Sequence, residues 1–441
     1  MSKFPFVSIK SIANKVAMGP FGSSIKVETF TSEGIPIISG AHLHNVKLTD
    51  GNYNFISPAH ASNLKNSIVH KKDIIFTHAG NIGQVSYIPD NSKYKNYIIS
   101  QRQFYLRCNE RALPEYVAYY FKSRKGKFSL LANSSQVGVP SIAQPVSYLK
   151  SIRIPLPEKK IQLAIVNILC SFDDKIELNR KMNETLEQMA QAVFQDWFVD
   201  FGPVKRKAKG ITDPVAILGG LIPDPIKAQK IAGLFPDQFA EDGPPEGWVQ
   251  SKLGHEFNVT MGQSPPGSTY NEINEGLPFF QGRRDFGFRF PKNRVYCNKP
   301  SRIAEKDWTL VSVRAPVGDI NRSHEKSCIG RGVSTLIHKS GLASYTYYYA
   351  LALRRVFENY NSNGTVFGSI NKKQLEDITI LAPNLSIVQT FDDLITGVDQ
   401  LILNNTDQNH TLAEMRDLLL PKLMSGEISV DELEKKMGGV L

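Results

Sequence analysis

The sequence has no long apolar run and few cysteines. No stretch reaches the roughly 18 consecutive apolar residues that a membrane-spanning helix needs, and the N-terminal MSKFPFVSIK lacks the apolar core of a signal peptide. The chain has 4 cysteines, and their positions, 108, 170, 297 and 328, show no paired spacing. This pattern is typical of a reducing compartment and offers no thiolate metal site. We therefore expect a soluble, cytoplasmic protein that has no membrane partner and binds neither a metal ion nor another cofactor.

The motifs of DNA-modifying and nucleotide-driven enzymes are missing as well. Amino methyltransferases flip the target base and hold it with an Asn- or Asp-Pro-Pro-aromatic loop, and neither Pro-Pro pair of this sequence has that context. The phosphate-binding pattern Gly-x-x-x-x-Gly-Lys-Ser/Thr is absent. His42 and His44 share a strand face, but the sequence indicates no third metal ligand. These absences predict a chain without a catalytic centre of its own.

Length and charge limit the architecture and the partner. At 441 residues the chain is too long for a single hydrophobic core and suits two domains with connectors. Its formal net charge of +10 favours a polyanionic partner, although many soluble proteins are mildly basic without binding one. Composition alone therefore names neither the fold nor the partner.

The most informative feature that is present is an internal repeat. A window near the middle of the chain matches a window at the C-terminus without gaps, 226 positions apart, as in Pro157 and Pro383 or Thr185 and Thr411. The stretches before these windows also resemble each other, at 34–37 and 276–279, 73–83 and 308–318, and 141–142 and 369–370. The period is far longer than that of a solenoid repeat. We infer two copies of a globular domain followed by a helix, and duplex DNA is the commonest large ligand with matching two-fold symmetry.

Both repeated windows have the periodicity of a helix that packs against a partner helix. Apolar residues recur at alternating steps of three and four. The predicted seam contains Phe172, Ile176, Asn179, Leu186 and Met189 in the first helix and Val398, Ile402, Asn405, Leu412 and Met415 in the second. An asparagine in each seam fixes the register of the pair. The alternative is that each helix is buried on its own domain, but charged flanks such as Asp173 and Asp174 favour pairing of the two helices with each other. We expect the pair to be antiparallel, because a parallel pair would place both globular domains at one end.

These features predict an α+β protein with two similar globular domains and two long helices that form an antiparallel, pseudo-two-fold coiled coil. The expected organisation is a first domain over 1–157, a helix over 158–200, a linker over 201–245, a second domain over 246–383, a helix over 384–424 and a tail over 425–441. In the linker, which is rich in Pro and Gly, we expect at most a short helix near Pro225–Ala232. Strands are predicted at 35–39, 73–77, 97–106, 308–313 and 328–337, and aromatic helices at 116–121 and 345–357.

Predicted turns in both domains are rich in side chains that hydrogen-bond to nucleic acids. Arginine suits guanine, Asn and Gln suit adenine, and Ser, Thr and backbone amides suit phosphates. The candidate DNA-binding residues are Thr77, His78, Asn81, Gln101, Arg102, Gln103, Ser135 and Gln136 in the first domain and Arg283, Arg284, Arg314, Arg331, Asn361 and Asn363 in the second. Because Gln101-Arg102 corresponds to Arg331-Gly332, we expect the two domains to prefer different half-sites.

The chain resembles the specificity subunit of a type I restriction–modification system over essentially its full length. The signatures are the segments 195–204 (QDWFVDFGPV), 235–239 (FPDQF), 245–248 (PEGW), 311–318 (VSVRAPVG) and 418–427 (LLLPKLMSGE). In the first domain His78 stands where the signature has an arginine. The resemblance implies a non-catalytic subunit that binds a bipartite, gapped DNA target, one half-site per target-recognition domain. It also implies two adenine methyltransferase subunits, recruited through the helices, and motor-nuclease subunits; we expect Trp197 and Phe198 to be accessible to the methyltransferase subunits.

Two other classes of protein are weaker alternatives. A self-contained modification enzyme is disfavoured because methyltransferase motifs are missing. A coiled-coil scaffold that binds only proteins would explain the helices, but it would not explain two domains with loops rich in Arg, Asn and Gln.

Overall fold

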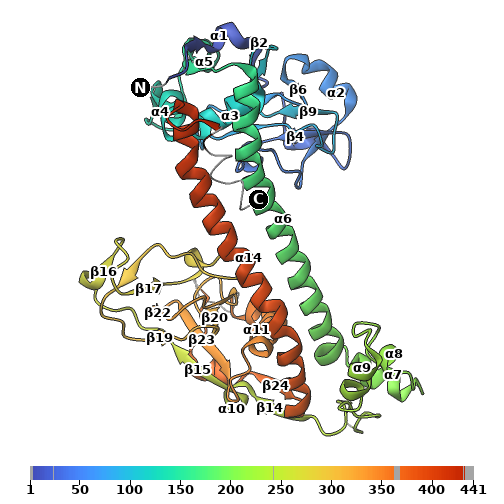
Figure 1. Cartoon of the computed structure of the whole chain (residues 1–441). Coiled ribbons are helices and arrows are strands. Elements are labelled where there is room, and N and C mark those ends of the chain that lie inside the picture. The colour runs from blue at the N-terminus through green and yellow to red at the C-terminus, as the bar shows by residue number, and fades with distance from the viewer. Residues whose placement is uncertain (1–2, 23, 242, 362–367, 431, 433–441) are drawn as a thin grey trace. The chain divides into compact units, whose positions relative to one another are not determined.

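The computed structural model describes residues 3–22, 24–241, 243–361, 368–430 and 432. These fall into two compact units: the first contains 1–178 and 408–441, and the second contains 179–407. Each unit has one globular domain and a segment of both long helices, α6 (Lys159–Phe194) and α14 (Leu385–Ser425) (Figure 1).

The main sheet has the same topology in both units. In the first unit the order is β2-β10-β7-β8, with β2 at Ala13–Met18, β10 at Gln103–Cys108, β7 at Ile74–Thr77 and β8 at Val85–Tyr87. In the second unit it is β15-β23-β20-β21, with β15 at Phe257–Met261, β23 at Val333–His338, β20 at Thr309–Ser312 and β21 at Ile320–Arg322. All six pairings are antiparallel.

A second sheet is repeated in the same way. Its order is β3-β5-β4-β9-β6 in the first unit: β3 Phe30–Thr31, β5 Phe55–Ile56, β4 Ile35–Ile38, β9 Asn96–Ile99 and β6 Ile68–His70. In the second unit it is β16-β18-β17-β22-β19: β16 Tyr270–Asn271, β18 Tyr296–Cys297, β17 Leu277–Phe280, β22 Ser327–Ile329 and β19 Ile303–Ala304. The pairs β4–β9 and β17–β22 are both parallel. The predicted duplication and the α+β class are therefore confirmed.

Smaller elements complete each domain and follow the predicted runs. A two-stranded sheet joins the start of each domain to the segment before its long helix: β1 (Phe6–Ser8) with β13 (Arg153–Pro155), and β14 (Val249–Lys252) with β24 (Thr379–Ala382). The runs predicted at 97–106 and 328–337 each contain two strands joined by a tight turn. The aromatic runs form α3 (Pro114–Lys122), and α11 (Ala343–Ala352) with α12 (Arg354–Glu358).

The aromatic helices carry the core of each unit. Helix α3 begins with proline in its first turn. Backbone N–H groups in the first turn have no acceptor within the helix, so a proline there costs no hydrogen bond. Its residues Tyr116, Tyr120 and Phe121 are buried with Phe76 and Phe104 of the main sheet. In the second unit α11 packs in the same place, next to the main sheet and the helices. Burial of such aromatic side chains, at about 25 cal/mol per Å² of apolar surface, is the main favourable term for each domain.

Within each unit the two long helices are in contact. In the first unit Arg416 Nη1 lies 2.5 Å from Asp173 Oδ1. In the second unit Asn405 donates to Asn183 Oδ1 at 2.9 Å, and the rings of Phe194 and Phe391 are 5.4 Å apart, so the segments run antiparallel as predicted.

The details of the predicted seam need two corrections. Asn405 does not pair with Asn179, because its partner is Asn183, which also donates to Ile402 O and Thr406 Oγ1. Met189 and Met415 are 59% and 41% exposed and lie outside the seam. The sequence repeat shows that Asn179 and Asn405 are equivalent positions of the two helices. It does not show which residues face each other across an antiparallel pair.

The expected exposure of Trp197 and Phe198 is wrong. Both lie on a π-helical turn, Gln195–Val199, that ends α6, and both are buried. Trp197 packs against Phe235 at 5.2 Å between ring centroids, and Phe198 packs against Tyr345 at 5.3 Å. The wider turn directs these two rings into the core of the second unit, so they stabilise this chain and are not free to bind another subunit.

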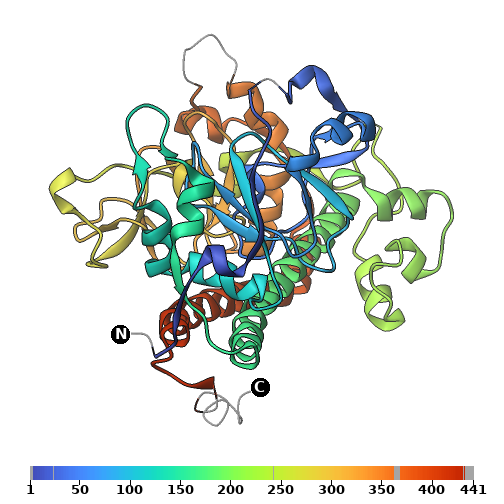
Figure 2. The same cartoon turned by 90° about the horizontal axis from the view of Figure 1, so that it is seen from above.

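The segment predicted as a linker is largely folded. Besides the expected α9 (Pro225–Ala232), it contains α7 (Gly202–Ala208) and α8 (Pro214–Ile217), which form a cluster of their own in Figure 2. Asp213 and Asp224 cap α8 and α9, each followed by proline in the first turn. Arg206 holds Asp196 at 2.6 and 3.0 Å and donates to Ile217 O. Asp-Pro therefore starts two helices in a segment where at most one short helix was expected.

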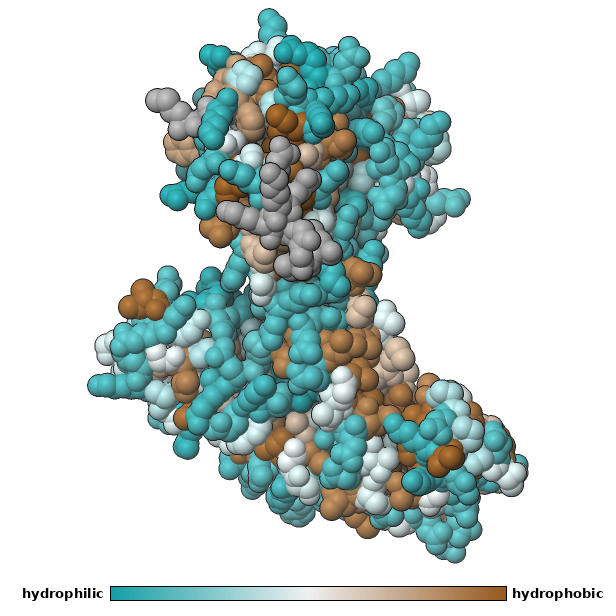
Figure 3. Space-filling model, in the orientation of Figure 1, coloured by the Kyte–Doolittle hydropathy of each residue, from teal (hydrophilic) through white to brown (hydrophobic). Residues whose placement is uncertain are grey.

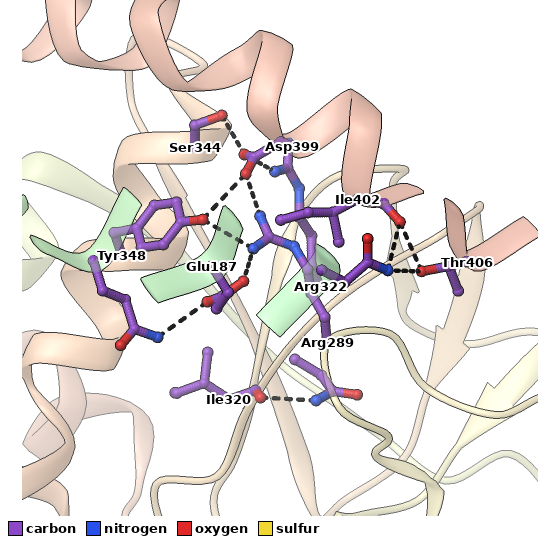
Figure 4. A network of polar contacts seen from close by, with 12 residues as sticks. Glu187, Arg289, Ile320, Arg322, Ser344, Tyr348, Asp399, Ile402 and Thr406 are labelled. Atoms are coloured by element: carbon purple, nitrogen blue, oxygen red, sulfur yellow. Dashed lines mark hydrogen bonds and ion pairs between the residues drawn. The ribbon is translucent and has the colours of Figure 1, made fainter. Parts of the chain in front are cut away.

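A buried ionic cluster attaches the second domain to both long helices (Figure 4). Asp399 of α14 accepts hydrogen bonds from Arg289, Arg322, Ser344 and Tyr348. Arg289 also donates to Glu187 of α6 and is 1% exposed. Burial alone would lower the pKa of Arg289, but the surrounding tyrosines and acidic side chains raise that pKa well above its usual range. The guanidinium is therefore charged, buried and held by both helices.

The first unit has a simpler version of this contact. Asp173, which lies 226 positions before Asp399, accepts from Tyr119 at 2.6 Å and from Arg416 at 2.5 Å. Tyr119 and Tyr348 occupy matching places on α3 and α11. The repeated aspartate, which the sequence analysis treated as an exposed flank, is thus the point where each aromatic helix binds its long helix.

We expect the substitution Asp399→Ala to destabilise the second unit by about 3–5 kcal/mol, because it leaves Arg289 and Arg322 charged and buried without their shared partner. All 3 tryptophans, at 197, 248 and 308, lie in this unit, so tryptophan fluorescence during urea unfolding reports on it alone. The control is Asp393→Ala on the same helix, an exposed residue bonded to Gln389, with an expected change within about 0.5 kcal/mol. Equal effects of the two substitutions would contradict this role of Asp399.

Candidate nucleic-acid interface

Three loops of the first unit are held together by main-chain hydrogen bonds. The loop after β7 donates from His78 N to Arg102 O at 2.9 Å, in the turn between β9 and β10. The hairpin of β11 (Ser134–Ser135) and β12 (Ser141–Ile142) joins the same loop, because Ile142 N donates to His78 O at 2.8 Å and Gly80 N donates to Pro140 O at 2.9 Å. We call these three segments, 78–83, 100–102 and 133–142, the first reading loops.

The second unit repeats these bonds at equivalent positions. Val313 N donates to Gly332 O at 2.9 Å, Ile370 N to Val313 O at 3.1 Å and Ala315 N to Gly368 O at 2.9 Å. Isolated bridges link Ala79 with Ser141 and Arg314 with Ser369. The described parts of 313–318, 330–332 and 361–370 are the second reading loops. The main chain thus builds the same loop arrangement in both units.

Most predicted DNA-binding residues on these loops are exposed. In the first unit they are Asn81, Gln101, Arg102, Ser135 and Gln136, and in the second they are Arg314 and Arg331. Arg283 and Arg284, also exposed, lie on a 3-10 turn that follows β17. That turn adjoins the second reading loops, because Gly330 N donates to Phe280 O at 2.8 Å. In the first unit the segment after β4 carries Gly40, Ala41 and His42 in place of these arginines. The two units therefore present different donors from the same frame.

Gly80 allows Arg102 to lie along its neighbouring loop. Its φ is +82°, a conformation that L side chains rarely adopt, and a Cβ at this position would be 3.3 Å from Arg102 Nη1. The exposed guanidinium of Arg102 therefore extends over the 78–83 loop, which gives the first unit one cation at this surface.

Two predicted residues, Thr77 and Gln103, do not face solvent. They are 2% and 1% exposed. Gln103 Nε2 lies 3.4 Å from Thr77 Oγ1, which in turn lies 3.3 Å from Gln84 Oε1, and Gln103 also bonds to Ser100. These side chains form a buried polar network under the loops, so their predicted contact with DNA is wrong for the chain as it stands. Gln84, which the sequence analysis missed, belongs to this network.

His78 is a supporting residue and not the counterpart of an arginine. The matching bonds make His78 equivalent to Val313 and Ala79 equivalent to Arg314, so the expected histidine-for-arginine exchange is displaced by one position. His78 Nε2 is 3.1 Å from Gln101 O, and its ring packs on Phe104. Burial lowers the pKa of His78 below its usual value, so the ring is neutral at neutral pH and holds the Gln101 turn without attracting phosphate.

The two predicted asparagines differ. Asn361 accepts from Val317 N at 2.7 Å and donates to Val317 O at 3.2 Å, so its amide fastens two of the second reading loops to each other. Asn363 lies outside the described residues.

An acidic residue that was not among the predicted site residues, Asp319, forms an ion pair with Arg283. Asp319, on the turn before β21, lies 2.7 Å from Arg283 Nε and 3.3 Å from Arg354 Nη2. Arg283 and Asp319 line a cavity of about 330 Å³ that also borders Glu187. The side chain of Arg283 is 62% exposed and that of Asp319 is 19% exposed, so Asp319 orients an arginine that still faces solvent.

The predicted helix residues line the contact between the chain's own helices. Phe172, Ile176, Asn179, Ile402 and Asn405 are buried, and Leu186, Val398 and Leu412 are half-buried. Other apolar residues of the long helices are exposed: Leu163, Met182, Met189, Leu401, Met415 and Leu418. Figure 3 shows apolar surface along the helices of the second unit.

The described residues show no sign of a membrane span or a metal centre. Within the described ranges, none of the helices has the length and apolar character needed to cross a bilayer. Nor does the described part of the chain bring together three or more His, Cys, Asp or Glu side chains in a group that could hold a metal ion.

The duplicated domain with its repeated loops belongs to a known class of DNA-specificity domains. The model of the type I restriction modification DNA specificity domain matches residues 1–188 and 245–412. These ranges make up more than half of the chain, which therefore belongs to the specificity-subunit family of type I restriction–modification systems.

Similar proteins extend over most of the chain. The candidate MjaX type I restriction enzyme specificity subunit of Methanocaldococcus jannaschii is 30% identical over 367 residues, 81% of this chain and 79% of that protein. The HindI type I restriction enzyme specificity subunit of Haemophilus influenzae is 27% identical over 406 residues, 82% of this chain and 87% of its own length. The crystal structure of the type I restriction–modification S subunit from M. genitalium has 18% identity and a TM-score of 0.57, covers 96% of both chains, and shares the fold.

The exposed arginines of the second reading loops can be sorted by their effect on specificity. If Arg314 or Arg331 reads a base, its substitution by Ala should cost about 1–3 kcal/mol of binding and relax one position of the second half-site. Competition binding on a library of single-base variants measures this effect. The control is Arg302→Ala, an exposed arginine of the same unit beside β19. An equal loss on all sequences, with a salt slope reduced by about 0.9, would assign the arginine to phosphate instead.

Proposed function

We propose that this chain is the non-catalytic DNA-recognition subunit of its restriction–modification complex. It binds a bipartite, gapped site on double-stranded DNA, each target-recognition domain taking one half-site, and it positions two adenine methyltransferase subunits and the motor-nuclease subunits. The observation that carries the proposal is the pair of reading-loop sets, which share their main-chain bonds and differ in their exposed side chains.

The differences between the loop sets support two half-sites of different sequence. The first set exposes Asn81, Gln101 and Arg102, which suit a mixture of adenine and guanine contacts. The second set exposes Arg314 and Arg331 beside Arg283 and Arg284, which suit guanine or phosphate. A net charge of +10 favours approach to the duplex in both cases.

The exposed apolar residues of the long helices support a role in assembly. Side chains such as Met182, Met189 and Leu401 stand on the outside of the helix pair, and exposed apolar patches mark protein interaction sites. We assign this surface to the methyltransferase subunits. The alternative, a scaffold that binds only proteins, would use the same surface but leaves the two reading-loop sets without a role.

Exchange of residues 1–157 for the corresponding domain of another specificity subunit should change one half-site and leave the other unchanged. The two domains have separate cores and separate loops, so each should read its half-site independently. Long-read sequencing of methylated host DNA gives both half-sites at once, and exchange of 246–383 is the matched control. A change in both half-sites after the first exchange would refute independent reading.

The purified chain alone should neither transfer methyl groups to DNA nor cleave DNA nor hydrolyse nucleotides. The measurement is incorporation of labelled methyl groups into DNA, with and without added methyltransferase subunits. We expect incorporation only when these subunits are present. Methyl transfer by the pure chain would place a catalytic centre within it and would overturn the assignment as a recognition subunit.

A further inference from the structure

The hairpin of the first reading loops ends in an exposed apolar tip. Val137 and Val139 are 89% and 62% exposed. Gly138 between them has a φ of +71°, and a Cβ there would meet nothing within 4 Å. Polar residues and glycine are the usual choice at such a turn, so two exposed valines on either side of a glycine are unusual there, and burial does not account for them. We call residues 137–139 the apolar tip.

The tip is fixed next to residues that suit base edges. The strands of the hairpin pair Ser134 with Ile142, and Gly80 N donates to Pro140 O directly after the tip. The same 78–83 loop is bonded to the turn that carries Gln101 and Arg102. The valines therefore belong to one surface with the exposed polar residues of the first unit, and a duplex that contacts Arg102 comes within reach of the tip.

Base edges in the major groove carry hydrogen-bonding groups and one apolar group, the C5-methyl of thymine. Asn, Gln and Arg side chains detect the hydrogen-bonding groups but gain nothing from the methyl. A branched apolar side chain gains about 0.8 kcal/mol for each methylene-sized group that it removes from water. We propose that the apolar tip reads a thymine methyl group in the first half-site, with Val137 or Val139 as the contacting side chain.

This inference rests on the proposed function, since it needs the first domain to read a half-site. A complex that methylates adenine requires an A·T pair in each half-site, so the first half-site contains at least one thymine. Replacing thymine by uracil removes only the methyl group and leaves base pairing unchanged. Uracil substitution is thus a direct probe of the proposed contact.

The experiment uses the full chain in complex with its methyltransferase subunits and duplexes with the target found by methylation sequencing. Each thymine of the first half-site is replaced in turn by deoxyuridine, and binding is measured by competition. For the wild-type chain we expect one deoxyuridine duplex to bind about fourfold more weakly, the equivalent of one methyl contact. Val137→Ala or Val139→Ala should bind the thymine and uracil duplexes equally.

The controls separate the tip from other effects. Val27→Ala changes a valine that is 79% exposed, on the 3-10 turn Val27–Thr29 of the same unit, and it should keep the fourfold difference. Deoxyuridine in the second half-site should have the same effect on the wild type and on all three variants. Unchanged melting temperatures would show that the variants fold normally.

Two outcomes would overturn the proposal. If no uracil in the first half-site weakens binding, the tip reads no methyl group. If both valine variants bind the thymine duplex and the uracil duplex more weakly by the same factor, the fourfold difference between the duplexes persists. The valines would then act as a wedge between base steps and would not read the methyl group. Failure of the proposed function is seen separately, since exchange of residues 1–157 would then leave the first half-site unchanged.

Discussion

The second unit depends on a buried charge that cannot be left alone. Arg289 is enclosed among tyrosines, and an isolated guanidinium there would cost several kcal/mol, so the domain must bring it to Asp399 and Glu187. Those two carboxylates lie on α14 and α6. One side chain of the domain therefore requires both helix segments to be present and in register. The first unit satisfies a weaker form of this requirement with Tyr119 and Asp173. In each unit these contacts fix the domain, and with it the reading loops, relative to the helix segments of that unit.

The duplication preserves the main chain and varies the side chains. Sheet order, parallel pairing and the three loop-to-loop hydrogen bonds are the same in both units. On the reading loops and the turn beside them, the side chains differ between the copies: Ala79 in place of Arg314, Gln101 in place of Arg331, and Gly40 to His42 in place of the 283–285 turn. Structural residues and reading residues are thus separated within a few positions of the same loops.

Much of the fold could be predicted from the sequence because its strongest signals are periodic. The repeat at 226 positions and the three-four spacing indicated two domains and two helices, and the aromatic runs formed helices where expected. Which residues of the two helices contact each other could not be predicted. Asn179 and Asn183 both satisfy the three-four spacing, and only the register of the antiparallel pair makes Asn183 the partner of Asn405. The linker has more structure than predicted, because proline and glycine are typical of turns whereas proline after Asp213 and Asp224 lies in the first turn of a helix.

The candidate site was predicted less well than the fold. Residue type pointed to loops that the main chain brings together, but it did not distinguish the buried Thr77 and Gln103 from the exposed Gln101 and Arg102 next to them. The side chains of Thr77 at the end of β7 and Gln103 at the start of β10 point inward. Their direction follows from the pairing of these two strands, which residue type does not encode. Asp399 was missed although it repeats Asp173, because a charged residue beside a seam is usually solvated. A repeated charge at equivalent positions was the signal that could have revealed it.

Since main-chain groups hold the reading loops, the fold places few demands on what those loops carry. His78, Arg102 and Pro140 contribute to loop closure through their backbone amides and carbonyls, which every substitution except one to proline retains. Exposed positions such as Gln101 or Arg331 can then change at little cost in folding free energy. A protein built this way can acquire a new target sequence through a few mutations while its attachment to the helices stays intact.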